Sequence, residues 1–222
     1  MAGRHGPDDG GTAWRVLDVA ERLVQQRGFN SFSYADIAGE LRITKAALHY
    51  HFANKADLGE ALITRYSARF AAALDAVESS AATAAAKLAG YTELYSQVLS
   101  ERRMCLCGML AAEYETLPQP MRDAVIGFFD RNESWLERVL EEGRRDRSLR
   151  FTSSARDTAR MIISGLEGAM LLARPYGDLT RFAAAVDSLI AGVCVPPGGL
   201  SDTPSRDGQA GCTDHDETTT RP

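Results

Sequence analysis

The chain has 222 residues, of which 45% are hydrophobic and 25% are charged, an ordinary composition for a globular protein. This length allows one large or two small domains with a hydrophobic core. No run approaches the ~18 apolar residues that a membrane helix needs, and the N-terminus lacks the apolar segment of a secretory signal. We therefore expect a cytoplasmic protein with no membrane partner. Four cysteines are too few in such a chain for a disulfide scaffold.

The formal net charge of −5 is, at first sight, unlike that of a protein that binds nucleic acid. Residues 41–56 depart from this average, because they hold Arg42, Lys45, Lys55 and two histidines but no acid. Net charge governs solubility and non-specific binding, whereas a local docking surface can differ in sign. The composition therefore leaves nucleic-acid binding open for this segment.

The first predicted helix covers residues 12–27, with Thr12 as its cap. Gly28 is a natural stop after it, since glycine readily adopts the left-handed conformation that ends many helices. Apolar residues recur in this helix at a spacing of three and four and so share one face; they are Val16, Leu17, Ala20, Leu23 and Val24.

Two short helices separated by a tight turn, with a third helix behind them, are predicted by the stretch SYADIAGELRITKAALHYHFANK. Ser33 can cap the first helix, with Asp36 three residues on in a box-like arrangement. Thr44 can cap the second helix. Leu48 and Phe52 lie four residues apart in that second helix and point inward together.

The opposite face of the second helix suits a DNA major groove, because small side chains there are combined with hydrogen-bonding rings and one basic residue. At about 100° per residue, this outer face and its flanks consist of Lys45, Ala46, Ala47, His49, Tyr50 and His51.

The segment ITKAALHYHFANKADL closely resembles the helix-turn-helix of the TetR family of bacterial repressors. Shared features are a hydroxyl cap, a lysine, a small pair, a leucine, an aromatic triplet, a phenylalanine and an Asn-Lys pair; they correspond to Thr44, Lys45, Ala46, Ala47, Leu48, His49, Tyr50, His51, Phe52, Asn54 and Lys55. The resemblance covers about residues 14–62, and the remainder matches that family only in size and helical pattern.

Two positions depart from the family's pattern. The turn between the helices often carries glycine, but here Arg42 occupies it. A left-handed residue with a side chain costs about 1–2 kcal/mol, so Arg42 either accepts this strain or the turn has a different shape. The first residue of the aromatic triplet is usually tyrosine and here is His49, so a base preference cannot be carried over from the family.

The resemblance implies a homodimeric, ligand-responsive regulator, most simply a repressor. It would bind a palindromic double-stranded operator, with recognition helices about one helical turn or a multiple apart. A small apolar or aromatic effector would release it. Lys55 would reach a phosphate, and Arg4 could reach a minor groove, although Asp8 and Asp9 oppose this. The DNA-contacting residues implied are Ser33, Tyr34, Thr44, Lys45, Ala46, Ala47, His49, Tyr50, His51 and Lys55.

The rest of the chain predicts only helices, because no segment shows the sustained alternation and β-branched residues of strands. Asn54 can cap a long helix that ends near Ser79 and Ser80. Further helices are predicted over about 88–102, 104–116, 120–145, 154–173 and 178–193. The fold class is therefore all-α.

Four segments follow from this pattern and from the resemblance. They are a disordered arm at 1–11, a helix-turn-helix DNA-binding domain at 12–55, a helical ligand-binding and dimerisation domain at 56–194, and a disordered tail at 195–222. The arm is rich in Gly and Asp and the tail in Pro, Gly, Ser and Thr, compositions that do not sustain a packed core.

The resemblance also implies an apolar ligand cavity between the helices of the second domain. Its candidate residues are Tyr91, Tyr95, Cys105, Met109, Tyr114, Phe128, Phe129, Trp135, Met161, Glu167 and Met170. Taken singly, each apolar member is better explained as ordinary core. Glu167 is the buried-polar candidate, since a buried carboxylate needs a partner or a purpose; it could equally lie at a dimer surface.

The resemblance implies a homodimer through the last two helices of each subunit. Small residues recur in both predicted helices; they are Gly165, Gly168, Ala169, Ala184, Ala185 and Gly192. Glycine inside a helix costs about 1 kcal/mol, which close helix approach would offset.

Cys105 and Cys107 lie two residues apart on a predicted helix, so they face opposite sides and make a poor metal site or local disulfide. Two interpretations stay open. In the first, both cysteines are small buried hydrophobic residues. In the second, one of the two thiols senses oxidants or electrophiles, as in some TetR-like repressors. Sensing needs a lowered thiol pKa, for example from a helix N-terminus and Arg102 or Arg103.

Enzymatic motifs are missing from the sequence: there is no nucleophile elbow, Walker loop, dinucleotide fingerprint or HExxH. His49 and His51 point to different helix faces and cannot share a metal, and Glu113 and Glu115 fail as an acid/base pair for the same reason. We therefore predict no enzyme, no metal and no cofactor. The alternative to a regulator is a helical small-molecule-binding protein without operator function.

Overall fold

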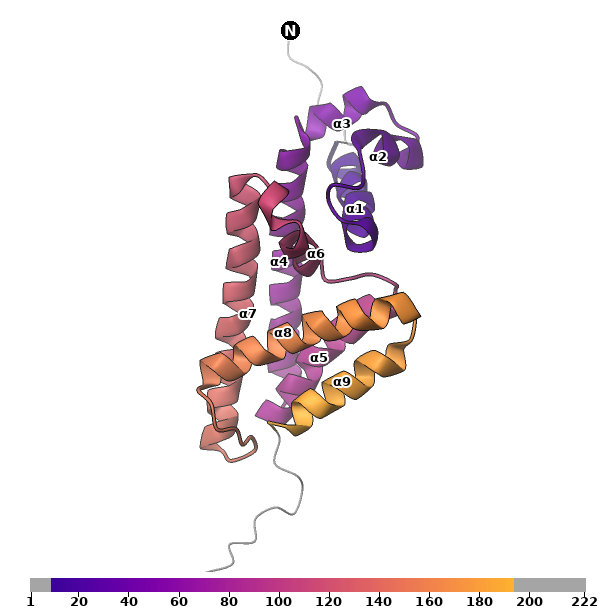
Figure 1. Ribbon diagram of the computed structural model, residues 1–222. Helices are drawn as coiled ribbons and strands as arrows, with labels where there is room; N and C mark the ends of the chain where they lie inside the picture. The colour runs from indigo at the N-terminus through magenta and orange to yellow at the C-terminus, as the bar shows by residue number, and fades with distance from the viewer. Residues whose placement is uncertain (1–8, 194–222) are drawn as a thin grey trace, which may run out of the picture.

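The computed structural model describes residues 9–193, and this part of the chain is helical without a strand (Figure 1). The predicted all-α class is confirmed. The helices are α1 (Asp9–Arg27), α2 (Tyr34–Leu41), α3 (Lys45–His51), α4 (Lys55–Ser80), α5 (Ala84–Ser100), α6 (Leu106–Ala112), α7 (Gln119–Arg145), α8 (Ala155–Ala173) and α9 (Leu179–Ala191), with 3-10 turns η1 (Tyr114–Thr116) and η2 (Arg174–Tyr176).

The predicted caps of α2, α3 and α4 are confirmed. Ser33 and Asp36 form a capping box in which the Asp36 carboxylate accepts a hydrogen bond from the Ser33 backbone nitrogen at 2.7 Å. Thr44 Oγ1 accepts from the third backbone N–H of α3 at 3.1 Å. Asn54 Oδ1 accepts from the third backbone N–H of α4 at 3.0 Å. These local bonds place α2 and α3 on either side of a tight turn.

Arg42 accepts the backbone strain that its place in this turn demands. It ends α2 at φ 55 and ψ 42, in the left-handed region. The turn then closes as the Ile43 N–H donates to the Ala38 carbonyl at 3.0 Å. Gly28 ends α1 at φ 89, which confirms the predicted stop. Each of the two turns therefore contains a residue in the left-handed conformation, which is glycine after α1 and arginine after α2.

Two long helices set the shape of the molecule. α4 leaves the N-terminal domain and lies beside α7, while α8 crosses both helices and packs against α7 and α9 (Figure 1). Aromatic rings fill the space between α4, α5 and α7. The Tyr91 and Trp135 rings stack at 5.6 Å, and the Phe70 and Phe128 rings meet edge to face at 5.3 Å. This cluster is the core of the second domain.

The helix predicted over 104–116 is shorter in the structure. α6 ends at Ala112, and a 3-10 turn follows. The helix begins only after Cys105, whose Sγ accepts from the Gly108 N–H at 3.4 Å and so caps it. The preceding helix ends at Ser100, because Arg102 takes a left-handed φ of 58.

The predicted arm at 1–11 is wrong in its last three residues, which belong to α1. Residues 1–8 and 194–222 lie outside the described part of the chain. The predictions for Arg4, for most of the arm and for the tail therefore fall there. Among residues 9–193, no helix combines the length and hydropathy that a transmembrane span requires.

Candidate functional site

The outer face of α3 lies at one end of the molecule, far from α8 and α9 (Figure 1). Leu48 is fully buried under it, whereas 65% of Tyr50 is exposed. Lys45, Ala46 and His49 are exposed as well. The helix therefore presents its predicted polar and small face outward, anchored by one leucine on the inner side.

His49 is oriented by its neighbours. Its Nδ1 lies 3.0 Å from the Ala53 carbonyl oxygen, and its ring lies 4.8 Å from that of Tyr34. A carbonyl oxygen only accepts, so Nδ1 carries the hydrogen of that bond. In the neutral ring Nε2 is then an acceptor, which matches the amino groups of cytosine and adenine in a major groove.

Tyr34 has a different role from the predicted DNA contact. Its side chain is buried, and its hydroxyl lies 2.6 Å from the Asn54 carbonyl oxygen and 3.0 Å from that of Phe52. Burial, helped by the charge of Asp57, raises the pKa of Tyr34 to about 12, so the hydroxyl stays a donor. Tyr34 thus holds the C-terminal end of α3 against α2 and so positions the outer face of α3.

Lys55 likewise departs from its predicted phosphate contact. Its Nζ donates to the carbonyls of Phe29, at 2.6 Å, and Phe32. It lies 4.7 and 4.2 Å from the centres of the two rings. Burial lowers the pKa of the half-buried ammonium. Lys55 is engaged in tying the α1–α2 turn to the start of α4, and this is its role in the described geometry.

The remaining predicted contacts stay on the surface. Ser33 and Thr44 are exposed at the starts of α2 and α3, and Ala47 and His51 are partly exposed. The Tyr50 and His51 rings meet edge to face at 5.2 Å. The structure thus brings eight of the ten predicted residues to one exposed edge, with Tyr34 and Lys55 behind them.

A cavity of about 460 Å³ lies between α6, α7 and α8 in the second domain. This volume is in the range of small-molecule sites. Three predicted pocket residues, Met109, Phe129 and Glu167, line it. The sequence interpretation missed the others, which are Met104, Gly108, Ala111, Ala112, Glu133, Arg160, Ile163, Ser164, Gly168 and Leu171. The five on α8 recur with Glu167 at a spacing of three and four, a stripe that the sequence contains, whereas the five from α6, α7 and the segment before α6 carry no comparable signal.

The other predicted pocket residues are placed elsewhere. Six are buried core and do not line this cavity; they are Tyr91, Tyr95, Cys105, Phe128, Trp135 and Met170. Met161 is 47% exposed. Tyr114 lies under the Arg122 guanidinium at 5.4 Å. Apolar residues of core and cavity wall look alike in a sequence, because both face inward at helical spacing.

Glu167 places a buried carboxyl group beside the cavity. Its Oε1 has no accessible surface and no hydrogen-bond partner. A Cβ at Gly108 would lie 2.2 Å from Oε2, so the carboxylate occupies space that only glycine leaves free. Burial raises the pKa of Glu167 to about 7, with a smaller opposing effect from a hydrogen bond with Cys105.

The lowered thiol pKa that sensing requires is contradicted at both cysteines. Burial and the nearby Glu167 carboxylate raise the pKa of Cys105 and of Cys107. The Tyr66 hydroxyl of α4 also donates to Cys105 Sγ at 3.8 Å. A buried thiol with a raised pKa is a poor nucleophile. Cys105 therefore connects α4, α6 and α8 as a packed, weakly polar group.

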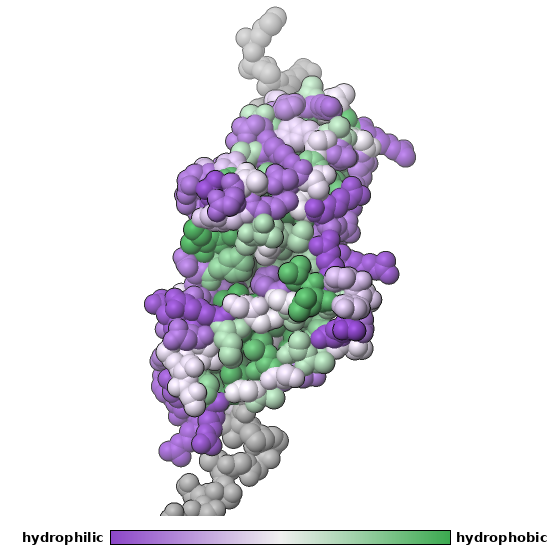
Figure 2. Space-filling view, viewed as in Figure 1, coloured by the Kyte–Doolittle hydropathy of each residue, from purple (hydrophilic) through white to green (hydrophobic). Residues whose placement is uncertain are grey.

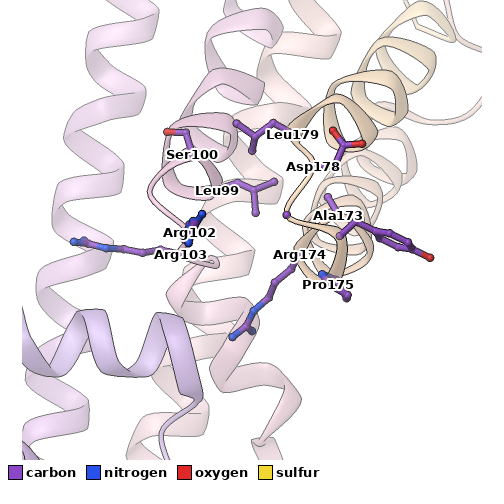
Figure 3. Close-up of a pocket in the computed structure, with 11 residues that line it drawn as sticks. Leu99, Ser100, Arg102, Arg103, Ala173, Arg174, Pro175, Asp178 and Leu179 are labelled. Atoms are coloured by element: carbon purple, nitrogen blue, oxygen red, sulfur yellow. The ribbon is translucent and has the colours of Figure 1, made fainter.

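A second cavity, of about 560 Å³, lies between the α5–α6 and α8–α9 connections. Arg102, Arg103 and Arg174 line it, but Figure 3 shows their guanidinium ends pointing in different directions. Arg174 instead reaches the Gln26 carbonyl at the end of α1. The arginines do not converge on one anion position, so this cavity is less suited to a specific ligand.

The segment after α6 ties the second domain to the first. Glu113 Oε2 accepts from the Phe29 backbone N–H at 2.6 Å, and both of its carboxylate oxygens lie 3.3 Å from the Asn30 nitrogen. Asn30 Nδ2 donates to Thr116 Oγ1 at 2.7 Å. The sequence interpretation weighed Glu113 only as a catalytic residue. Its role depends on a neighbour 84 residues away.

Metal binding finds no support in the geometry. Within residues 9–193, no three His, Cys, Asp or Glu side chains gather as metal ligands would. His49 and His51 have separate neighbours, as their spacing predicts.

Two family models match the chain. The model of bacterial regulatory proteins of the TetR family covers residues 16–62, and the model of the tetracycline-repressor-like C-terminal domain covers residues 84–189. The first contains α2 and α3, and the second contains the cavity between α6, α7 and α8.

Relatives with known names are transcriptional regulators. The transcriptional regulator AcuR of Cereibacter sphaeroides is 31% identical over 178 residues, which is 77% of this chain and 80% of AcuR. The regulator AcrR of Shigella flexneri is 30% identical over 183 residues, which is 78% of this chain and 84% of AcrR.

A solved TetR-family regulator from Agrobacterium tumefaciens has the same fold, with a TM-score of 0.82 and 30% identity, covering 84% of this chain and all of that one. These relatives are regulators and not enzymes. The chain therefore belongs to the TetR family of transcriptional regulators, and its N-terminal helix-turn-helix is a DNA-binding domain.

Proposed function

We propose that the chain is a homodimeric repressor that binds a palindromic operator through α3 and releases it when a small effector enters the cavity between α6, α7 and α8. One observation carries this proposal. Ala111 and Ala112 of α6 line the cavity, and the next residue, Glu113, holds the α1–α2 turn of the DNA-binding domain. A change in the cavity therefore has a short mechanical route to the helix-turn-helix.

In this proposal the exposed edge of α2 and α3 contacts DNA. Lys45 and the N-terminal end of α3 approach phosphates or a guanine, while His49 and Tyr50 face base edges. Ser33, Thr44, Ala46, Ala47 and His51 complete the surface, and Tyr34 and Lys55 position it from behind. Such a regulator acts in the cytoplasm, where the chromosome lies.

The dimer is proposed to form through α8 and α9. Apolar side chains gather over these helices in Figure 2. Among them Met161, Leu172 and Leu179 are strongly exposed, Leu172 to 70%. Exposed apolar patches of this kind mark interaction sites. A two-fold dimer would place two copies of α3 on successive half-sites.

Release requires that the effector bind the DNA-free conformation more tightly than the DNA-bound one. Two elements can transmit that preference. α4 runs from the aromatic core to the start of the DNA-binding domain, and Glu113 links α6 to the α1–α2 turn. A small displacement of either element changes the separation of the two recognition helices in a dimer.

The test is a titration of the full chain against the DNA immediately upstream of its own gene, at several salt concentrations. We expect saturable binding that depends on a palindrome and falls steeply with salt. Lys45→Ala and Tyr50→Ala should abolish specific binding without changing the fold. Arg138→Ala, an exposed change on α7 at the other end of the molecule, is the matched control.

Sedimentation of a Leu172→Glu variant tests the dimer in the same preparation. A charge in the proposed interface should give monomers and weaken operator binding. Specific DNA binding that survives both Lys45→Ala and Tyr50→Ala would contradict the recognition surface. Binding that is indifferent to sequence would favour a helical ligand-binding protein without operator function.

A further inference from the structure

The cavity between α6, α7 and α8 has an unpartnered carboxyl group beside it. Glu167 Oε1 is shielded from solvent and has no hydrogen-bond partner, although the cavity lies beside it. A buried carboxylate oxygen without a partner is costly, and native structures retain one only for a reason. The thiol of Cys105 is the other polar neighbour, and it is a weak donor.

The basic residue of the cavity is already engaged. Arg160 Nε lies 3.0 Å from Glu133 Oε2, and its Nη1 lies 3.3 Å from Asp157 Oδ1. Within residues 9–193, Glu167 has no ion pair, and Glu133 adds a second acidic group to the lining. The cavity thus lacks a positive charge at the position where it holds an isolated negative one.

The walls suit an apolar body that carries such a charge. Met109, Phe129 and Ile163 line the cavity together with small residues of α6 and α8. Aromatic rings attract alkylammonium groups, and flexible methionine side chains adapt to irregular apolar ligands. An amine in this space can donate to Glu167 Oε1 while its hydrocarbon part remains against these side chains.

We propose that the effector is a small organic amine, bound as a cation by Glu167 with its apolar part between α6, α7 and α8. This inference rests on the proposed function only in treating the bound molecule as the effector. An anion would meet Glu133 and Glu167 without a free guanidinium to hold it. A neutral molecule could donate a hydrogen bond to Glu167 Oε1 but would bring no opposite charge to it.

The proposed contact between the amine and Glu167 would also affect the position of α4. Glu167 shares a hydrogen bond with the Cys105 thiol, which in turn accepts one from the Tyr66 hydroxyl at 3.8 Å. An ammonium that draws the carboxylate into the cavity weakens its contact with the thiol. That loosens the junction of α4, α6 and α8, the elements that lead to the DNA-binding domain.

The test compares three ligands of one shape, hexylammonium, 1-hexanol and hexanoate, by calorimetric titration of the full chain without DNA. We expect hexylammonium to bind about tenfold more tightly, or better, than either of the others. Glu167→Gln should remove this preference, with a thermal midpoint no lower than that of the wild type. Glu137→Gln, an isosteric change on α7 outside the cavity, should keep it.

Gly108→Ala provides a second variant, because its Cβ displaces the Glu167 carboxylate without removing it, and it should weaken hexylammonium binding. Equal or tighter binding of hexanol or hexanoate overturns the proposal, as does a preference that survives in Glu167→Gln. The absence of saturable hexylammonium binding at millimolar concentration overturns it too, and the wild-type series decides this even if a variant misfolds.

Operator release is measured separately by adding hexylammonium to the protein–DNA complex. If the amine binds but the protein stays on the operator, the amine site is supported and its role as the effector site is rejected. Failure of the free protein to bind any operator would reject the proposed function while leaving the amine site to the calorimetric result.

Discussion

The proposed recognition surface, which is the exposed edge of α2 and α3, and the cavity between α6, α7 and α8 are built in opposite ways. The surface comes from one contiguous stretch, in which caps, turn and outward side chains lie within about twenty residues. The cavity is assembled from three helices, with Gly108 on α6, Phe129 on α7 and Glu167 on α8. Local hydrogen bonds shape the first, whereas packing between distant segments shapes the second. Changes in each region should therefore have separable consequences.

The largest effect is expected from Leu48→Ala, which removes the buried anchor of α3. Such a truncation costs about 2–5 kcal/mol, and the small N-terminal domain has few other contacts to compensate. Hydrogen exchange should show the loss of amide protection concentrated in α1, α2 and α3. Leu166→Ala, an equally buried truncation in α8, is the control and should lose protection in the second domain. A uniform loss across the molecule in both variants would refute this separation.

Glu167 should give the stability of the protein a pH dependence near neutral pH, arising in the cavity region. Its pKa is raised by burial from 4.5 to about 7 in the folded chain. The folded state therefore binds the proton more tightly, and stability should fall as pH rises through this window, by up to about 3 kcal/mol. Chemical denaturation at pH 5 and pH 8 measures it, and Glu167→Gln should remove most of the difference.

Other groups near Glu167 are not expected to produce this change. Burial raises the pKa of Cys105, Cys107 and Tyr66 above that window, and the charged pair at the rim is Glu133 and Arg160. An unchanged pH profile in Glu167→Gln would assign the effect to another group.

Glu113→Ala tests the connection between the two regions. It leaves the backbone N–H groups of Phe29 and Asn30 without their acceptor and should cost about 1–2 kcal/mol. We expect operator binding to persist while ligand-induced release becomes weaker, measured as the change in operator affinity between ligand-free and saturated protein. Glu115→Ala, an exposed change two residues away, is the control. Full release in Glu113→Ala would assign the coupling to α4 alone.

The smallest effect concerns the turn before α3. Arg42→Gly relieves a left-handed residue and should stabilise the fold by about 1 kcal/mol at most. Thermal unfolding measures this gain, and Arg138→Ala should show no such increase. A loss of stability would indicate that the Arg42 side chain contributes more than its backbone conformation costs.

Much of the fold could be predicted because its signals are local. The caps at Ser33, Thr44 and Asn54 lie within three residues of their partners, and the inward position of Leu48 follows from helical spacing. The prediction of the pocket residues was less accurate, because Met109 and Phe128 are both apolar residues at helical spacing and the sequence does not tell them apart. Only the packing of α6 against α8 places the first in the cavity wall and the second in the core.

The sequence by itself determined the all-α class, the position of the helix-turn-helix and the family, since these depend on periodicity and on motifs read along the chain. Only the tertiary structure decided the roles of Lys55, Glu113 and Glu167. The sequence does not distinguish a charged helix residue that faces solvent from one that contacts a backbone group or lines an apolar cavity. Its environment, which sets its pKa and its partner, comes from segments far away in the chain.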